Sequence, residues 1–340
     1  MVDAEKTLAL CLFLRYTKNN AKECGRVTLD NQAQVLRNIA DNVEKVIVGK
    51  REQIELVICA LLCRGHVLIE DVPGVGKTSL VSALARSVGC SFKRIQFTPD
   101  ILPSDITGFS MFNQKTGEFE YRNGAVMSQI ILADEINRTS PKTQASLLEA
   151  MEESRVTVDG TTYDLPKPFI VLATQNPVEY LGTYPLPEAQ LDRFFVKVTL
   201  GYPDFAEESR ILTKHAAQVS PMDTLEAVAS ADDILTMQKM VADVYVDPKI
   251  NDYIVTIVTM TRNDEGVALG GSPRASICMY KAAQANAFLA GRDYVVPDDV
   301  QKMAAHVLEH RILMKQEAKL KRITPAKVIE KVLKTAQVVK

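Results

Sequence analysis

One stretch, residues 66–80 (HVLIEDVPGVGKTSL), constrains the fold of this chain more than any other. Its apolar VLI run predicts a short buried strand, its PGVG segment predicts a loop, and Lys77 and Thr78 begin a helical pattern. In such an arrangement the backbone N–H groups of the loop and of the helix N-terminus surround phosphate oxygens, and the lysine ammonium group reaches the terminal phosphates. The stretch therefore predicts a phosphate-binding loop between a strand and a helix.

The loop departs at one position from the general pattern G-x-x-x-x-G-K-[ST], which has glycine where this chain has Asp71. That first glycine serves the turn rather than the phosphate, so the prediction stands. A turn without a ligand would explain the Pro-Gly pair but not the Lys-Thr pair placed before an amphipathic helix. We expect the phosphates to be bound by the whole loop, and Thr78 also to ligate Mg²⁺. The predicted loop residues are Asp71, Pro73, Gly74, Val75, Gly76, Lys77, Thr78 and Ser79.

Composition limits the broad class of the protein. A length of 340 residues is enough for two domains, and 46% apolar with 24% charged residues is typical of a globular protein. The formal net charge of −2 gives no overall electrostatic argument for nucleic acid or an anionic membrane. No apolar run approaches the roughly twenty residues needed to span a bilayer. The cysteines include no C-x-x-C pair, which favours a reducing compartment, and we expect the protein to be cytoplasmic.

The order of predicted elements indicates the fold. Strand and helix patterns alternate from about residue 30 to residue 200, which favours an α/β sandwich around a parallel sheet of five strands. Residues 98–108, rich in proline, are expected to form a loop. Residues 109–123 and 155–165 have the alternation and central turns of hairpins.

Beyond residue 203 the strand patterns stop and only helical patterns follow. The expected domains are thus an N-terminal extension over 1–29, an α/β core over 30–204, and a linker helix with an all-α domain over 205–340.

An acidic pair supplies the second half of a nucleotide site. Asp134 and Glu135 follow the apolar run IILA, at the carboxyl end of a predicted strand. Asp134 is expected to hold Mg²⁺ and Glu135 to polarise the water that attacks the γ-phosphate. Two solvated acids at a strand end are common, so the pair is weak evidence alone. The phosphate-binding loop roughly 55 residues upstream makes it strong.

Three further residues have side chains suited to a γ-phosphate. Asn176 follows the strand FIVLAT, and its amide could hydrogen-bond the attacking water or the phosphate, although a turn Asn before proline is the first choice when the segment is taken in isolation. Arg193 lies just before the last predicted strand of the core, and Arg274 lies where Ser-Pro begins a helix. A guanidinium at the γ-phosphate stabilises developing charge, whereas a surface ion pair is the alternative for each. The residues alone do not choose between the two arginines.

The segment His306 to His310 spells H-x-x-E-H, a pattern found in some zinc enzymes. No third ligand follows it, and it falls in the helical C-terminal part. We expect no zinc site here, because a short motif without supporting context is usually accidental.

Five segments in sequence, GVGKT, ADEINRTSPKTQASLLEAMEE, ATQNP, LPEAQLDRF and GGSPRAS, together resemble the MoxR family of AAA+ ATPases. The resemblance covers nearly all of residues 30–315. It implies an αβα P-loop NTPase core with a helical lid, and a ring, usually a hexamer, with ATP bound between subunits.

The resemblance also implies a role for each candidate residue. By this resemblance the Walker A pair is Lys77 and Thr78, and the Walker B pair is Asp134 and Glu135. Sensor 1 is Asn176, the arginine finger is Arg193, sensor 2 is Arg274, and Val48 with Gly49 lies beside adenine.

Family members are thought to be chaperones for assembly or cofactor insertion, often with partners that carry von Willebrand factor A domains. The two hairpins resemble inserts that face the pore or the substrate in ring relatives. The predicted function is thus ATP- and Mg²⁺-dependent remodelling of a client protein. A DNA-remodelling motor and a nucleotide-gated scaffold without turnover are the alternatives. A GTPase is disfavoured because no N-K-x-D stretch is present.

Overall fold

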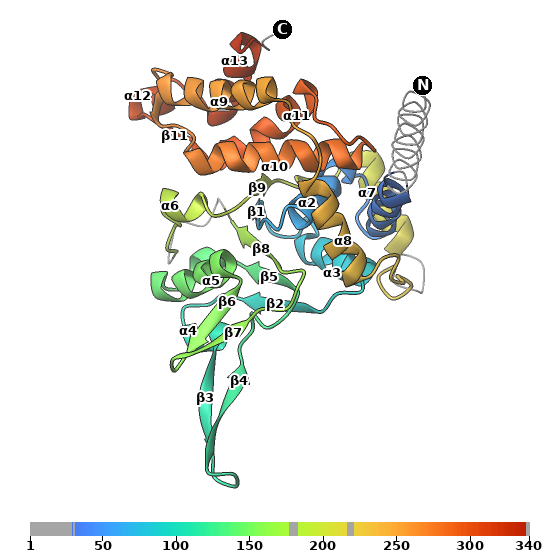
Figure 1. Cartoon of the computed structure of the whole chain (residues 1–340), viewed down its shortest axis with the longest axis vertical. Coiled ribbons are helices and arrows are strands. Elements are labelled where there is room, and N and C mark those ends of the chain that lie inside the picture. The colour runs from blue at the N-terminus through green and yellow to red at the C-terminus, as the bar shows by residue number, and fades with distance from the viewer. Residues whose placement is uncertain (1–28, 30, 177–182, 216–220, 338–340) are drawn as a thin grey trace, which may run out of the picture.

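The computed structural model describes residues 29, 31–176, 183–215 and 221–337, so the expected N-terminal extension lies outside it apart from Leu29. At its centre is a parallel five-stranded sheet, as predicted, with the strand order β2-β5-β8-β1-β9 (Figure 1). The strands are β1 (Val67–Glu70), β2 (Phe92–Gln96), β5 (Ile130–Asp134), β8 (Ile170–Gln175) and β9 (Val196–Val198).

Side chains alternate across this sheet between two separate apolar cores. Ile69, Leu132 and Leu172 pack on one face with the helix at 31–44, with α2 (Arg51–Leu62) and with α3 (Lys77–Ser87). Their neighbours Leu68, Ile131 and Val171 pack on the other face, mainly against α5 (Pro141–Glu153). Because both faces are covered there, the inner strands β1, β5 and β8 begin with unbroken apolar runs, which is the pattern expected of parallel strands, whereas the edge strand β2 keeps polar side chains.

The segment expected to be a loop at 98–108 contains a short helix, α4 (Pro103–Thr107). Proline at its first position and a hydrogen bond from the Leu102 N–H to the Asp105 carboxylate (2.9 Å) start the helix. The two prolines that suggested a loop therefore mark the approach to a helix and its first turn.

The C-terminal part is helical, as predicted, and its helices from residue 248 onward form the layer at the top of Figure 1. One departure is a pair of very short antiparallel strands, β10 (Val267–Leu269) and β11 (Leu313–Met314), too short for alternation to appear in the sequence. No helix in the described ranges is long and apolar enough to cross a bilayer. Helix α6 (Glu188–Leu191) still belongs to the core, before β9. The helices of the C-terminal part are α7 (Phe205–His215), α8 (Ala231–Ala242), α9 (Pro248–Asn263), α10 (Pro273–Leu289), α11 (Pro297–Leu308), α12 (Gln316–Leu320) and α13 (Pro325–Thr335).

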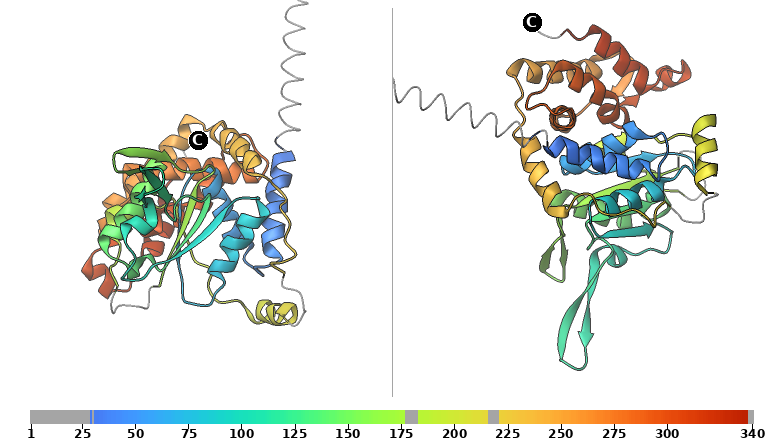
Figure 2. Two further views of the ribbon diagram at one scale, coloured as in Figure 1. Left: turned by 90° about the horizontal axis from the view of Figure 1, so that it is seen from below. Right: turned by 90° about the vertical axis from the view of Figure 1, so that its right-hand side faces the viewer.

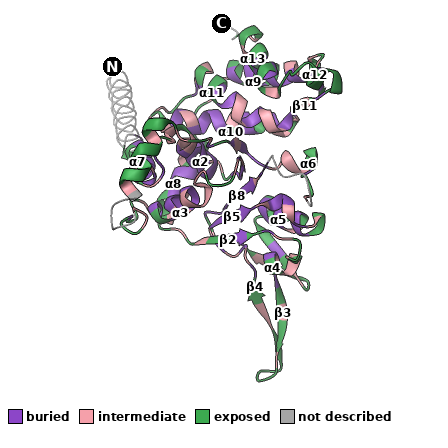
Figure 3. Cartoon of the chain, turned by 180° about the vertical axis from the view of Figure 1, so that it is seen from behind, coloured by how far each residue is buried: buried purple, intermediate pink, exposed green. Residues whose placement is uncertain are grey.

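Two antiparallel hairpins extend from the core, β3 (Gly108–Asn113) with β4 (Glu118–Asn123), and β6 (Arg155–Val158) with β7 (Thr161–Asp164). The β3–β4 hairpin projects away from the sheet in Figure 1 and in the right-hand view of Figure 2, and its residues are largely exposed (Figure 3). The Tyr121 ring stacks on the Tyr163 ring with centroids 4.0 Å apart. The two hairpins therefore meet and form one surface.

A buried histidine connects the sheet to α5 at the amino end of β1. The His66 Nδ1 accepts a hydrogen bond from the Val171 N–H (3.0 Å), so its Nε2–H donates to the Met151 carbonyl (2.9 Å). Burial lowers the pKa of His66 to about 4, although the hydrogen bond to Met151 favours the charged form. The imidazole is therefore neutral in the folded protein near pH 7.

This arrangement predicts a loss of stability in mild acid. The pKa of His66 is lower in the folded protein than its ordinary value of about 6.5, so its contribution is complete above that value and is lost as the pH falls towards about 4. The loss between pH 7 and pH 5 is about 2 kcal/mol. His66→Gln keeps an acceptor and a donor but does not titrate. We expect urea unfolding at the two pH values to show about 2 kcal/mol less loss in the variant. Equal losses in both proteins would contradict this.

Candidate functional site

The loop between β1 and α3 has the backbone geometry of a phosphate cradle. Gly74 and Gly76 both lie in the left-handed region, with φ of 85° and 90°. Gly76 is also the N-cap of α3, and it has no side chain to accept from the first-turn N–H groups. The N–H groups of this first turn and the Lys77 ammonium group together favour an anion as the ligand.

Residues from five elements and loops meet around this cradle in one cavity of about 410 Å³. It brings together most of the loop, the acidic pair after β5 and the amide after β8, as well as two residues of β2 that the sequence did not suggest. The lining residues are Pro73, Gly74, Gly76, Lys77, Thr78, Ser79, Arg94, Gln96, Asp134, Glu135 and Asn176.

The acidic pair is oriented by a threonine of the neighbouring strand. The Thr174 hydroxyl donates to the Asp134 Oδ1 (2.6 Å), and the Glu135 N–H donates to the same hydroxyl (2.8 Å). Glu135 has φ of 59°, a left-handed conformation that is uncommon for a residue with a side chain. Such backbone strain is typical of functional positions.

Strand β2 contributes two contacts to the acids. The Arg94 guanidinium donates to the Asp134 Oδ2 (2.6 Å), and the Gln96 amide donates to the Glu135 Oε2 (2.7 Å). The same carboxylate of Glu135 lies 3.3 Å from the Arg138 Nε. Alternation in FKRIQ places Arg94 and Gln96 on one face, but the sequence does not tell that β2 pairs with β5. Only the strand order makes them site residues.

Thr78 and Asp134 are the residues that could hold Mg²⁺. A hydroxyl and a carboxylate that line the same cavity are hard oxygen donors of the kind that Mg²⁺ prefers, and room remains in the cavity for water and phosphate ligands. The residues therefore fit this cation.

Asp71, expected in the phosphate-binding loop, uses its side chain elsewhere. Its buried carboxylate accepts from the N–H groups of Leu200 and Gly201, both at 2.7 Å. Its backbone carbonyl accepts from the Lys77 ammonium group (2.9 Å). The carboxylate thus ties the start of the loop to the chain that leaves β9, and only the backbone of Asp71 faces the cradle.

The segment expected beside adenine lies between the loop and that linker. Val48 is buried, and the Ile47 side chain reaches the Gly76 position, where an added Cβ would lie 3.5 Å from it. Gly49 has φ of 74°, and the Glu207 side chain of α7 packs so closely over it that an added Cβ would force that side chain to move. Ile47 therefore adjoins the cradle, and Val48 and Gly49 follow it outside the cavity lining.

Arg193 and Arg274 lie away from the phosphate-binding loop of their own chain. Both guanidinium groups contact the carboxylate of Glu152 near the end of α5, Arg193 at 3.3 Å and Arg274 at 3.0 Å. Among the described residues, the cavity lining contains neither arginine. The structure brings the two arginines to each other but not to Lys77.

The H-x-x-E-H segment takes part in packing. The His310 Nε2 lies 3.1 Å from the Phe194 carbonyl, and burial holds the pKa of His310 well below its usual range. The His306 Nε2 lies 3.9 Å from a Glu52 carboxylate oxygen. Within the described part of the chain, no three His, Cys, Asp or Glu side chains cluster as metal ligands would.

Family models match both parts of the chain. Residues 66–196 match the ATPase family associated with various cellular activities (AAA), and residues 259–332 match an AAA lid domain. A solved structure from Cytophaga hutchinsonii, provisionally named an ATPase, superposes with a TM-score of 0.87 at 38% identity and covers 95% of this chain and 99% of that chain.

Two curated bacterial relatives match over most of their length. The uncharacterized protein YeaC of Bacillus subtilis is 54% identical over 89% of this chain and 95% of its own. Chaperone MoxR1 of Mycobacterium tuberculosis is 42% identical over 92% of this chain and 84% of its own. With an identity this high over the core, the lid and the linker between them, the chain belongs to the MoxR family of AAA+ ATPases.

Proposed function

We propose that the protein hydrolyses ATP with Mg²⁺ at sites shared between subunits of a ring, and uses the cycle to remodel a client protein. The observation that carries the proposal is the separation of two half-sites. The loop and acidic pair line one cavity, while the two arginines meet on Glu152 elsewhere. The described lining of the cavity holds neither Arg193 nor Arg274, and its own Arg94 is paired with Asp134, so in this proposal a neighbouring subunit supplies the arginines.

Each pocket residue has a defined task in the proposed reaction. Lys77 and the amides at the start of α3 bind the phosphates, and Asn176 at the end of β8 orients the attacking water or the γ-phosphate. When bound by Thr78 and Asp134, Mg²⁺ would neutralise charge on the β- and γ-phosphates. Glu135 accepts the proton of the attacking water.

The contacts of Glu135 also suggest how turnover is restrained. Its carboxylate is held by the Gln96 amide and lies beside Arg138. The Gln96 contact fixes the direction in which the Glu135 carboxylate points, so activity depends on the arrangement at the end of β2.

In the proposed ring, Arg193 is the arginine finger and Arg274 is sensor 2, and both act in trans on the phosphate of a neighbour. We take a hexamer as the ring size from the family resemblance. A guanidinium that meets a γ-phosphate only at an interface makes hydrolysis depend on assembly.

The projecting hairpin favours a protein client over DNA. Four large apolar side chains on β3–β4 are 43–74% exposed: Phe109, Met111, Phe112 and Phe119. The charged residues of the hairpin are two basic and two acidic, so it has no basic patch for phosphate backbones. A partner with a von Willebrand factor A domain remains part of the proposal through the resemblance. The cysteine pattern favours the cytoplasm as the place of action.

The role of Glu135 predicts a variant that binds but does not hydrolyse ATP. We expect Glu135→Gln to keep ATP affinity and to lower kcat by about 10²–10⁴-fold, because proton transfer is lost. Lys77→Ala is the matched comparison and should lose nucleotide affinity instead. Phosphate release and titration with a fluorescent ATP analogue measure the two effects. Substantial hydrolysis by Glu135→Gln would sink the assignment.

Shared sites predict complementation between two inactive variants. Arg193→Ala alone should lower kcat by about 10³-fold or more. In mixed rings, a subunit with Arg193→Ala keeps Glu135, and a neighbour with Glu135→Gln supplies Arg193. At equal amounts about one quarter of the interfaces are complete, so about one quarter of the native activity should return. No recovery at any mixing ratio would count against hydrolysis in trans.

Asp71→Gly restores the glycine of the general loop pattern. From the position of the Asp71 carboxylate we predict that this change lowers the stability of the fold but leaves ATP binding nearly unchanged. ATP affinity should change by less than about threefold, since the carboxylate faces Leu200 and Gly201. Loss of three charge-assisted hydrogen bonds, from the N–H groups of Val72, Leu200 and Gly201, should lower the free energy of unfolding by about 3 kcal/mol or more. Asp71→Asn, which keeps an acceptor, is the control. A large loss of ATP affinity with unchanged stability would contradict this account.

A further inference from the structure

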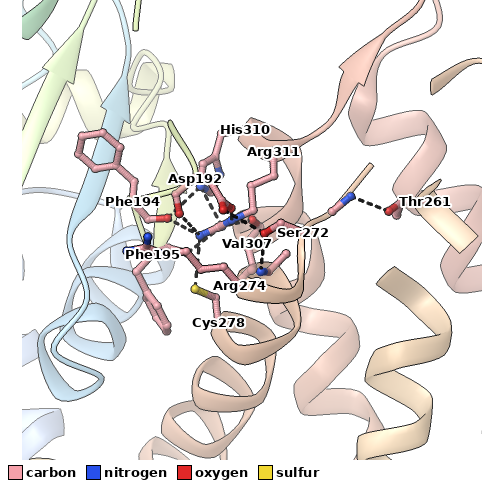
Figure 4. Close-up of polar contacts among 12 residues, drawn as sticks. Asp192, Phe194, Phe195, Thr261, Ser272, Arg274, Cys278, Val307, His310 and Arg311 are labelled. Atoms are coloured by element: carbon pink, nitrogen blue, oxygen red, sulfur yellow. Dashed lines mark hydrogen bonds and ion pairs between the residues drawn. The ribbon is translucent and has the colours of Figure 1, made fainter. Parts of the chain in front are cut away.

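One carboxylate bridges the core and the lid beside the proposed arginine finger (Figure 4). The Asp192 Oδ1 accepts from the Arg311 Nε (2.7 Å), and its Oδ2 accepts from the Ser272 hydroxyl (2.9 Å). Asp192 directly precedes Arg193, and Ser272 is the N-cap of α10, two residues before Arg274. Each end of the bridge is therefore next to one of the two arginines.

Arg311 holds the backbone on both sides of Arg193. Its side chain is only 1% exposed, and its nitrogens contact the carbonyl oxygens of Asp192 (3.3 Å), Phe194 (2.5 Å) and Phe195 (3.2 Å). It also contacts the Val307 carbonyl and the Cys278 sulfur. Displacing a buried guanidinium with this many partners costs a large free energy, so Arg311 fixes the segment at 192–195 to the lid.

The spacing of the two arginines suits a single anion. Glu152 forms an ion pair with Arg193 through one carboxylate oxygen and accepts a hydrogen bond from Arg274 through the other. A phosphoryl group presents oxygens with a similar spacing and more charge. The two guanidinium groups are thus already arranged around one anionic group.

We propose that Asp192, Arg311 and Ser272 are positioning residues that present Arg193 and Arg274 as one unit to the phosphate of a neighbouring subunit. This rests on the proposed function, in which both arginines act in trans. Since Ser272 and Arg311 belong to the lid and Asp192 to the core, the bridge holds Arg193 and Arg274 in a fixed relation across the boundary between core and lid.

Ser272 offers a matched pair of variants that leave the helix start intact. The Ser272 hydroxyl also accepts from the Ala275 N–H (3.2 Å), and both Asp and Asn are good N-caps that can replace it there. Ser272→Asp places a second negative charge beside Asp192 and breaks the bridge. Ser272→Asn keeps a donor for the Asp192 carboxylate. The difference between the two variants reports the bridge rather than the cap.

The test places each variant in one of the two subunits of the complementing mixture. Ser272→Asp combined with Glu135→Gln lies in the subunit that supplies the arginines, and we expect it to reduce the recovered kcat by about 10–100-fold. The KM for ATP should stay within about twofold, because the nucleotide pocket belongs to the other subunit. When Ser272→Asp is combined with Arg193→Ala instead, it lies beside a neighbour's site that has already lost its arginine finger. The recovered kcat should then be unchanged. Ser272→Asn should recover activity in both placements.

Each outcome separates the possibilities. Equal losses in both placements mean a structural role and overturn the proposal, and so does full recovery in both. If the mixture without a Ser272 change already shows no recovery of ATP hydrolysis, hydrolysis in trans is contradicted. The proposal that the bridge positions the arginines for a neighbour is then overturned with it. Should Ser272→Asp not assemble, Arg311→Lys takes its place in the same two subunits. It keeps the charge but cannot contact Asp192 and the 194–195 carbonyls together, so the same placement-dependent loss is expected.

Discussion

The site depends on a parallel sheet that is buried on both faces. Apolar side chains occupy both faces of β1, β5 and β8, so polar groups enter only where these strands end. The carboxyl ends of parallel strands share one edge, and there the phosphate-binding loop, the acidic pair and Asn176 meet in one cavity. Thr174 joins two of these ends by contacting both acidic residues. The chemistry of the core is thus a consequence of strand packing.

Two carboxylates connect the residues around the site to other parts of the chain. The Asp71 carboxylate holds the chain where it leaves β9, and the Asp192 carboxylate is bonded to Ser272 and Arg311 of the lid. One connection begins at the phosphate-binding loop and the other ends beside Arg193. In the proposed ring, the Asp192 connection would couple the position of the lid to the segment beside Arg193.

Local patterns in the sequence predicted the features that depend on neighbouring residues. The loop around Lys77, the acidic pair and both hairpins have periodicity or turn chemistry within a short window. Arg94 and Gln96 could not be predicted as site residues, because their role depends on β2 lying beside β5. Likewise Arg311 lies 119 positions from Asp192, and nothing local marks it as a partner. The β10–β11 pair was missed because its strands are too short to alternate.

The central claim is that one chain holds only half of each catalytic site. The most direct measurement is ATP hydrolysis per subunit as the protein is diluted through its assembly range, with particle mass followed in parallel. We predict that turnover per subunit falls together with the ring, while a single chain still binds ATP through the loop at Lys77. Constant turnover per subunit down to the isolated monomer would contradict the account.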